Sequence, residues 1–169
     1  MEQKIVIKES VRGIVEYVLK SGSLDDRFMS IGRAMEGTIA HGKLQKDNEN
    51  IYEDYQKEVK LQWGFIRDNI ELIIEGRTDG IIKESNNVII EEIKSTYKSL
   101  IYIEEDYNEL HWAQGKFYGY IYCKENNLKK IRIRLSYYDL NTDEVKSFEK
   151  EFILTELEAF VSELVETYM

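Results

Sequence analysis

The sequence contains no proline and only one cysteine, Cys123. A lone thiol excludes an internal disulfide and any metal cluster held only by cysteines of this chain. With no proline, no internal repeat and no low-complexity linker, nothing marks a domain boundary. We therefore expect residues 1–169 to form a single domain, long enough to bury a hydrophobic core.

Long apolar runs are missing as well. None approaches the roughly 18 residues that a membrane-spanning helix needs. The N-terminal segment "MEQKIVIKES" does not follow the signal-peptide pattern. These absences predict no membrane association and, with the scarcity of cysteine, a location in the reducing cytoplasm.

The sequence also has few positive charges. It contains 23 lysines and arginines against 32 aspartates and glutamates, which gives a net charge of −9. This balance argues against a generally basic nucleic-acid-binding surface. It does not argue against a nuclease, whose active site must itself gather carboxylates to hold metal ions. It does predict that the domain alone binds DNA weakly.

The hydrophobic pattern predicts a mixed α/β domain with a central mixed sheet flanked by helices. Ser10 is the expected N-cap of a first helix, and further helices are expected near residues 30–46, 107–123 and 155–169. Alternating apolar residues predict an antiparallel meander with strands near residues 57–66, 70–76, 80–84 and 88–95. A second hairpin is expected between Lys129 and Phe152.

The segment "VIIEEIK", residues 88–94, carries charges that a buried strand rarely accepts without a use. Alternate side chains of a strand point to opposite faces, so Glu92 and Lys94 emerge side by side at its end. Asp79 is expected in the turn that enters the preceding strand, where the hairpin brings it close to Glu92. Two carboxylates and the backbone carbonyl of Ile93 suit Mg²⁺ or Mn²⁺. Lys94 can then orient or deprotonate a water, or stabilise charge on a phosphorane.

The same spacing has a plainer interpretation, in which Glu92 and Lys94 are an exposed strand end. Further segments favour a site: "GRTDG" with "IIEEIKS", then "QGKFY", and upstream "EGTIAHGKLQ". In this order they resemble the core signature, the QxxxY motif and the GxxxH motif of the PD-(D/E)XK nuclease superfamily, RecB-like branch. Both ends of the chain also resemble nuclease-like domains found ahead of DinG/XPD-type helicases.

The resemblance implies a restriction-endonuclease-like core with Asp79, Glu92 and Lys94 as catalytic residues. It implies that His41, Asp79, Glu92 and the backbone carbonyl of Ile93 bind Mg²⁺ or Mn²⁺. It also implies that Gln114 and Tyr118 position the DNA. Some nucleases of this branch hold an iron–sulfur cluster with several cysteines, and because this chain has one cysteine, no such cluster is expected.

The resulting hypothesis is a metal-dependent DNA nuclease for repair or recombination, acting as an exonuclease or on single strands and flaps. Its expected partners are DNA and a helicase, in cis or in trans, and the resemblance allows the chain to be the N-terminal part of a larger helicase protein. One alternative is a catalytically silent nuclease-fold module that binds nucleic acid or serves as a scaffold in a helicase complex. Another is an RNA nuclease or a different phosphodiesterase that uses the same site.

Other residues allow two interpretations each. His111 can line a DNA groove or pack as an ordinary histidine, and Arg77 can pair with a carboxylate or contact phosphate. Glu75 and Glu91 can add a second metal site, although Glu91 should point to the opposite face of the strand from Glu92. Stacking on single-stranded bases and ordinary packing are equally compatible with Tyr97, Tyr102 and Tyr107.

Overall fold

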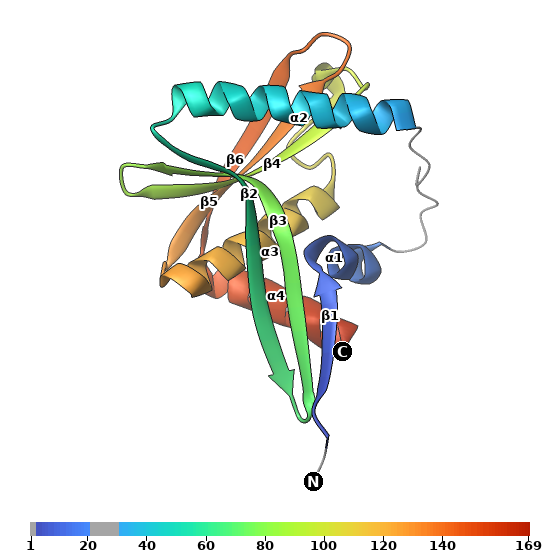
Figure 1. Cartoon of the computed structure of the whole chain (residues 1–169), viewed down its shortest axis with the longest axis vertical. Coiled ribbons are helices and arrows are strands. Elements are labelled where there is room, and N and C mark those ends of the chain that lie inside the picture. Colours follow the sequence, from blue (N-terminus) through green and yellow to red (C-terminus); the bar gives the residue numbers. More distant parts are fainter. Residues whose placement is uncertain (1–2, 21–30) are drawn as a thin grey trace.

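The computed structural model describes residues 3–20 and 31–169. Its strands are β1 (Ile5–Ser10), β2 (Asp54–Arg67), β3 (Ile70–Glu84), β4 (Asn87–Thr96), β5 (Lys130–Asp139) and β6 (Val145–Ile153). Its helices are α1 (Val11–Leu19), α2 (Ile31–Ile51), α3 (Glu109–Asn126), α4 (Leu154–Tyr168) and the short 3₁₀ helix η1 (Leu100–Tyr102). In this part of the chain the strands form one mixed six-stranded sheet with helices on both faces (Figure 1), which confirms the α/β prediction.

The strand order is β1-β3-β4-β5-β6, and β2 pairs with β3 as a long antiparallel hairpin. The expected meander and the second hairpin, β5–β6, are both present. Parallel pairs join β1 to β3 and β4 to β5. The sheet is therefore mixed.

One prediction was wrong, because Asp79 does not lie in a turn between two strands. Residues 70–84 form the single strand β3, which pairs with β2 over most of its length. The two glycines on either side of Asp79 clear space for tyrosine rings. A Cβ on Gly76 would come within 2.5 Å of the Tyr118 hydroxyl oxygen, and a Cβ on Gly80 within 2.8 Å of the Tyr55 ring.

The strands β3 and β4 pair over only part of their length and then separate. They pair only from Gly80–Glu91 to Glu84–Asn87. Beyond that point β3 pairs with β1, and β4 continues along β5 as far as Thr96. The separation leaves an open fork in the sheet beside Asp79 and Glu92.

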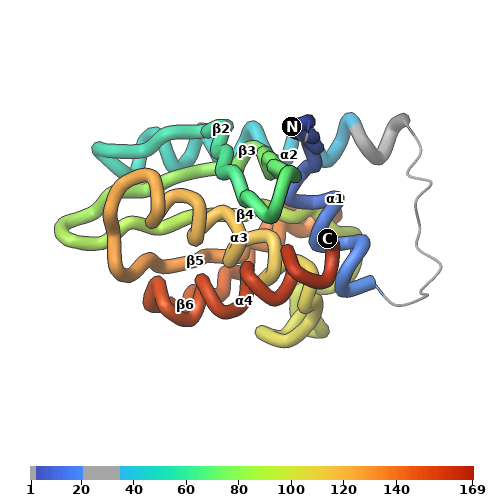
Figure 2. The backbone as a smooth tube through the Cα atoms, turned by 90° about the horizontal axis from the view of Figure 1, so that it is seen from below, coloured from blue at the N-terminus to red at the C-terminus, as the bar shows by residue number. Residues whose placement is uncertain are grey.

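The helices α1, α3 and α4 cover one face of the sheet and enclose the hydrophobic core. Ser10 caps α1 as predicted, because its Oγ accepts a hydrogen bond from Gly13 N–H at 2.8 Å. α3 packs so closely on β5 that a Cβ on Gly115 would come within 2.5 Å of Ile133 Cγ2. Figure 2 shows α2 along one side of the sheet and α4 along the other.

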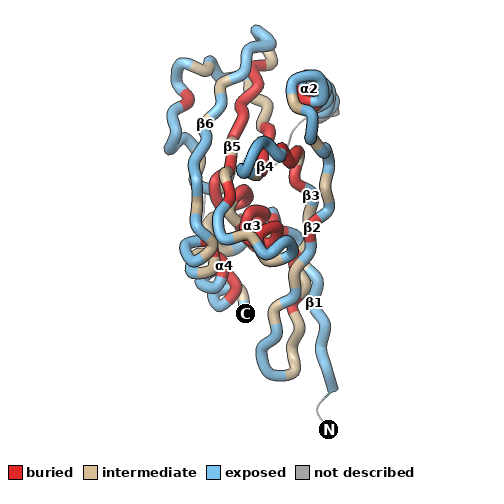
Figure 3. Tube along the Cα trace, turned by 90° about the vertical axis from the view of Figure 1, so that its left-hand side faces the viewer, coloured by how far each residue is buried: buried red, intermediate tan, exposed pale blue. Residues whose placement is uncertain are grey.

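α2 crosses the opposite face of the sheet and differs from the other helices in its length and exposure. It runs on to Ile51, five residues beyond the expected end at Lys46, and the expected first residue, Ser30, lies outside the described residues. Most residues of its part from Met35 to Ile51 are exposed, and Figure 3 shows the helix end-on with mostly the colour of exposed residues. None of the described helices has the length and apolar character needed to cross a lipid bilayer.

Two glycine substitutions should separate the close packing of α3 from the open setting of α2. Gly42 lies in α2, and a Cβ added there would have no neighbour within 4 Å, so Gly42→Ala should stabilise the protein by about 0.5–1 kcal/mol through helix propensity. Gly115→Ala should instead destabilise it by about 1–3 kcal/mol through overpacking against Ile133. Urea unfolding measures both changes. Equal effects of the two substitutions would contradict the packing described for α3.

Candidate active site

Asp79 and Glu92 exchange hydrogen bonds across the fork. Glu92 Oε2 accepts the backbone N–H of Asp79 at 3.1 Å, and Asp79 Oδ2 accepts the backbone N–H of Ile93 at 2.7 Å. The hydroxyl of Thr78 also donates to Glu92 Oε2, at 3.2 Å. Where the backbone ladder stops, the two carboxylates take over as acceptors, which fixes both side chains.

Burial dominates the electrostatics of this carboxylate pair. Glu92 is 4% exposed, and desolvation followed by the neighbouring Asp79 carboxylate raises its pKa to about 8. Desolvation also raises the pKa of Asp79, against the hydrogen bond from Ile93 and the nearby His41 and Lys94 side chains. Two close carboxylates in a desolvated position favour a bound proton or a cation.

Lys94 and Gln114 meet across the sheet–helix interface. The Lys94 ammonium donates to Gln114 Oε1 at 2.6 Å, which joins the end of β4 to α3. Tyr118, one turn further along α3, is 7% exposed and lies against the backbone of Gly76. The structure thus brings the two α3 residues to the same fork as Lys94.

His41 approaches from α2 on the other side. Its Nδ1 lies 3.8 Å from Asp79 Oδ1, the oxygen that the Ile93 N–H does not use. Gln45, one turn along α2, donates to the backbone carbonyl of Asp79 at 3.0 Å and to Glu58 Oε1 at 2.8 Å. Asp79 is therefore in contact with α2 through both its side chain and its backbone.

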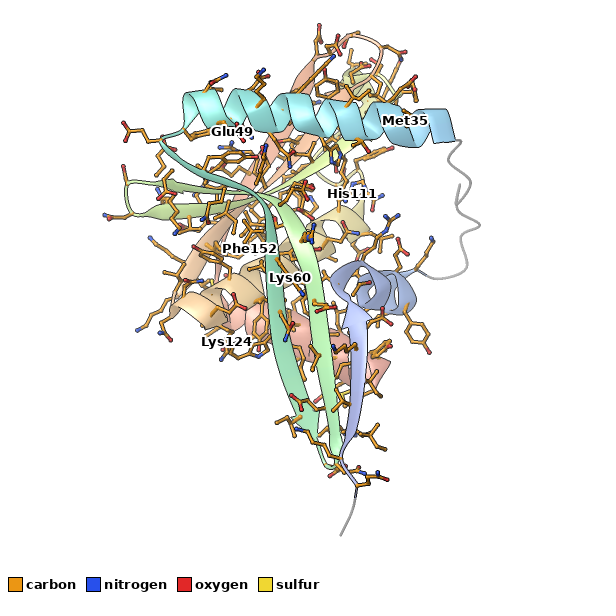
Figure 4. The ribbon with its side chains drawn as sticks, viewed as in Figure 1. Met35, Glu49, Lys60, His111, Lys124 and Phe152 are labelled. Atoms are coloured by element: carbon orange, nitrogen blue, oxygen red, sulfur yellow. The ribbon has the colours of Figure 1, made fainter. Side chains whose placement is uncertain are left out.

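One cleft of about 510 Å³ lies between α1, α2, α3 and the fork, and it is lined by the residues expected at the site: His41, Asp79, Glu92, Ile93, Lys94, Gln114 and Tyr118. In Figure 4 His111 lies in view between α2 and α1, and it lines the same cleft as His41 and Arg12. Its Nδ1 is 3.0 Å from the hydroxyl of Tyr137. Burial, then Lys94 and Arg12, lowers the pKa of His111 to about 3, so its imidazole is neutral at physiological pH. Arg77 completes the cationic side of the cleft.

The donor set in this cleft fits a hard divalent cation. Asp79 and Glu92 supply carboxylate oxygens, Ile93 supplies a backbone carbonyl and His41 an imidazole, which together suit Mg²⁺ or Mn²⁺. The hydrogen bonds described above use Asp79 Oδ2 and Glu92 Oε2 and leave Asp79 Oδ1 and Glu92 Oε1 for a ligand. Within the described residues, no three His, Cys, Asp or Glu side chains already converge on one point as a formed metal site.

Other candidates lie away from the fork. Glu75 pairs with Lys60 at 3.6 Å further along β3. Glu91 is buried on the face opposite Glu92, as strand alternation predicted, and contacts Asn48 of α2. The tyrosines that follow β4 are partly exposed, at 38%, 70% and 39% for Tyr97, Tyr102 and Tyr107.

Two contributors escaped the sequence interpretation. Thr78 is fully buried and holds Glu92, yet only its position next to Asp79 hinted at this. Asn48 lies seven residues after His41, a helical spacing that repeats the face of His41 and Gln45. That spacing was the available signal, but a polar face on a long helix normally faces solvent, which hid its meaning.

Comparisons with known proteins bear on the fold alone. No protein-family model matches the chain, and the curated proteins give no significant match. Among solved structures it is similar to the crystal structure of SSO0001, with a TM-score of 0.57 and 18% sequence identity. The similarity covers 99% of this chain and 78% of that chain. At this identity it supports the shared α/β architecture.

The raised pKa of Glu92 predicts that Glu92→Gln stabilises the metal-free protein, and by more at high pH than at low pH. Because its pKa rises from 4.5 to about 8 in the folded protein, its ionisation destabilises the metal-free fold progressively as pH increases through this range. In EDTA, Glu92→Gln should therefore raise Tm relative to the wild type by at least about 3 °C more at pH 9 than at pH 5. Glu84→Gln, at the exposed hairpin turn, is the control and should show no such trend. A Tm difference independent of pH would contradict this account.

Proposed function

We propose that this protein is a divalent-metal-dependent nuclease of the PD-(D/E)XK superfamily, RecB-like branch, that hydrolyses phosphodiester bonds in DNA. The observation that carries the proposal is the fork. There the carboxylates of Asp79 and Glu92 each accept a backbone N–H from the other strand, and Lys94 lines the same cleft. His41, Gln114 and Tyr118, the other residues of the resembling motifs, line the same cleft. Residues from four separate segments of the sequence thus meet at one place.

The cleft residues that match the resembling motifs have separate roles in this proposal. Asp79, Glu92, His41 and the carbonyl of Ile93 would hold Mg²⁺ or Mn²⁺, which would polarise the scissile phosphate and lower the pKa of a bound water. Lys94, fixed by Gln114, orients or deprotonates the attacking water or stabilises the negative charge that develops on the phosphate. Gln114 and Tyr118 position the DNA backbone against the fork.

The expected setting is DNA repair or recombination, with exonuclease or single-strand and flap cleavage as the activity. A net charge of −9 leaves little cation release to drive binding, so the domain alone should bind DNA weakly. A helicase in cis or in trans would supply the missing affinity. The second candidate is a silent nuclease-fold module in a helicase complex, and it differs from the first in a single observable, which is cleavage.

Lys94→Ala should separate catalysis from metal binding. Removing a nearby cation leaves the two carboxylates and should not weaken Mn²⁺ binding, whereas turnover should fall by at least about 100-fold. End-labelled single- and double-stranded oligonucleotides with Mn²⁺, Mg²⁺ or EDTA measure turnover, and calorimetry measures Mn²⁺ affinity. Lys83→Ala, exposed near the tip of the same hairpin, is the matched control and should cleave like wild type. Metal binding without any cleavage by the wild type would favour the silent module.

His41→Ala should behave in the opposite way. It removes a candidate ligand, so the concentration of Mn²⁺ needed for half-maximal cleavage should rise by about 10-fold or more, and high Mn²⁺ should recover much of the activity. Lys46→Ala, exposed on the same helix, should leave the Mn²⁺ dependence unchanged. If His41→Ala lowers the maximal rate without changing the Mn²⁺ requirement, His41 is not a metal ligand.

A further inference from the structure

A buried carboxylate outside the catalytic cleft remains unexplained by the proposed function. Glu91 is 1% exposed and pairs with Gly80 of β3, next to Glu92 in the chain but on the opposite face of β4. A carboxylate in such a position costs stability unless its oxygens are satisfied. Both oxygens are: Asn48 Nδ2 donates to Oε1 at 2.6 Å, and Ser136 Oγ donates to Oε2 at 2.7 Å.

The partners of Glu91 are held in turn. Arg134 Nη1 lies 3.9 Å from Glu91 Oε2 and donates to the hydroxyl of Tyr52, just after α2, at 3.0 Å. The Arg134 Nε also donates to Glu149 of β6 at 2.8 Å. Glu91 is thus the point where three strands and the C-terminal end of α2 are tied together.

α2 depends on these contacts because it has little apolar anchorage. Among the large apolar residues on its described part, Met35, Ile39 and Ile51 are 60%, 57% and 69% exposed, and Leu44 is only half-buried. Gly37 apart, the buried side chains on its described part are Ala40, Gln45 and Asn48, and two of these three are amides. Gln45 and Asn48 lie one and two turns from His41 on the same helical face. Directional hydrogen bonds therefore determine where this face rests on the sheet.

We infer that Asn48 and Glu91 are positioning residues for the metal site, which act by holding α2 so that His41 stays beside Asp79. The inference rests on the proposed function, because it assigns these residues to the placement of a metal ligand. Neither residue lines the cleft itself. Supporting contacts of this kind commonly change metal affinity by about 10- to 100-fold when they are lost.

The test is a double-mutant cycle on Mn²⁺ affinity, measured by calorimetry with the full chain. Asn48→Ala should weaken Mn²⁺ binding by about 10-fold in the wild-type background. In the His41→Ala background the same substitution should change the affinity little, because the ligand that it positions is already gone. Asn50→Ala, an exposed asparagine two residues along α2, is the matched control and should have no effect in either background.

A conservative variant separates position from charge. Glu91→Gln keeps an oxygen to accept the Asn48 hydrogen bond, so it should bind Mn²⁺ almost as tightly as wild type, whereas Glu91→Leu should resemble Asn48→Ala. If Glu91 acted through its negative charge on the cation, Glu91→Gln would weaken binding as much as Glu91→Leu, and the inference would be wrong. Hydrogen exchange supplies a readout without metal: Asn48→Ala should speed exchange of the α2 amides and leave those of α3 unchanged.

The failure of this inference and the failure of the nuclease proposal give different results. Equal losses of affinity from Asn48→Ala in both backgrounds would show a general structural effect and overturn the inference while leaving the nuclease proposal intact. Unchanged exchange in α2 would overturn it as well. A wild type that binds no Mn²⁺ would overturn the proposed metal site and the positioning role together.

Discussion

At the fork between β3 and β4 the backbone ladder ends, and the carboxylates of Asp79 and Glu92 take the place of main-chain acceptors. Buried N–H groups must find partners, so the separation of the two strands is tolerated only because these side chains supply them. The same hydrogen bonds orient the carboxylates toward the cleft. The two hydrogen bonds therefore stabilise the open sheet and also form the acidic centre of the candidate site.

Strand alternation then divides the charged run "EEIK" between two tasks. Glu92 and Lys94 face α3, where Lys94 meets Gln114, and Glu91 faces α2, where it meets Asn48. The adjacent carboxylates are both desolvated and both have raised pKa values, yet their surroundings differ. Glu91 has two neutral donors and an arginine within reach, whereas Glu92 shares its surroundings with a second carboxylate. A cation is therefore favoured beside Glu92, whereas the oxygens of Glu91 already have hydrogen-bond donors and a nearby arginine.

Local patterns predicted the mixed α/β fold, the cap of α1 and the grouping of Asp79, Glu92 and Lys94, because each depends on periodicity or on neighbours within one hairpin. The turn expected around Asp79 was wrong because β3 continues through this segment along β2, where Gly76 and Gly80 make room for Tyr118 and Tyr55. The partners of Glu91 could not be predicted either. Asn48 and Ser136 lie 43 and 45 positions away in sequence, and only the tertiary structure brings them to one carboxylate.

The two helices beside the fork are held by different physical means, and this difference bears on how the site is assembled. α3 is fixed by close apolar packing, with Gly115 against Ile133 and Phe117 fully buried, so its residues Gln114 and Tyr118 have little freedom. α2 is fixed through Gln45 and Asn48, whose hydrogen bonds are directional and satisfied only at one position of the helix. A buried amide–carboxylate hydrogen bond of 2.6 Å weakens steeply when donor and acceptor move out of line, so it restricts the position of α2 without a large apolar contact. A helix with little apolar contact can therefore still hold one imidazole beside one carboxylate oxygen through its buried amides.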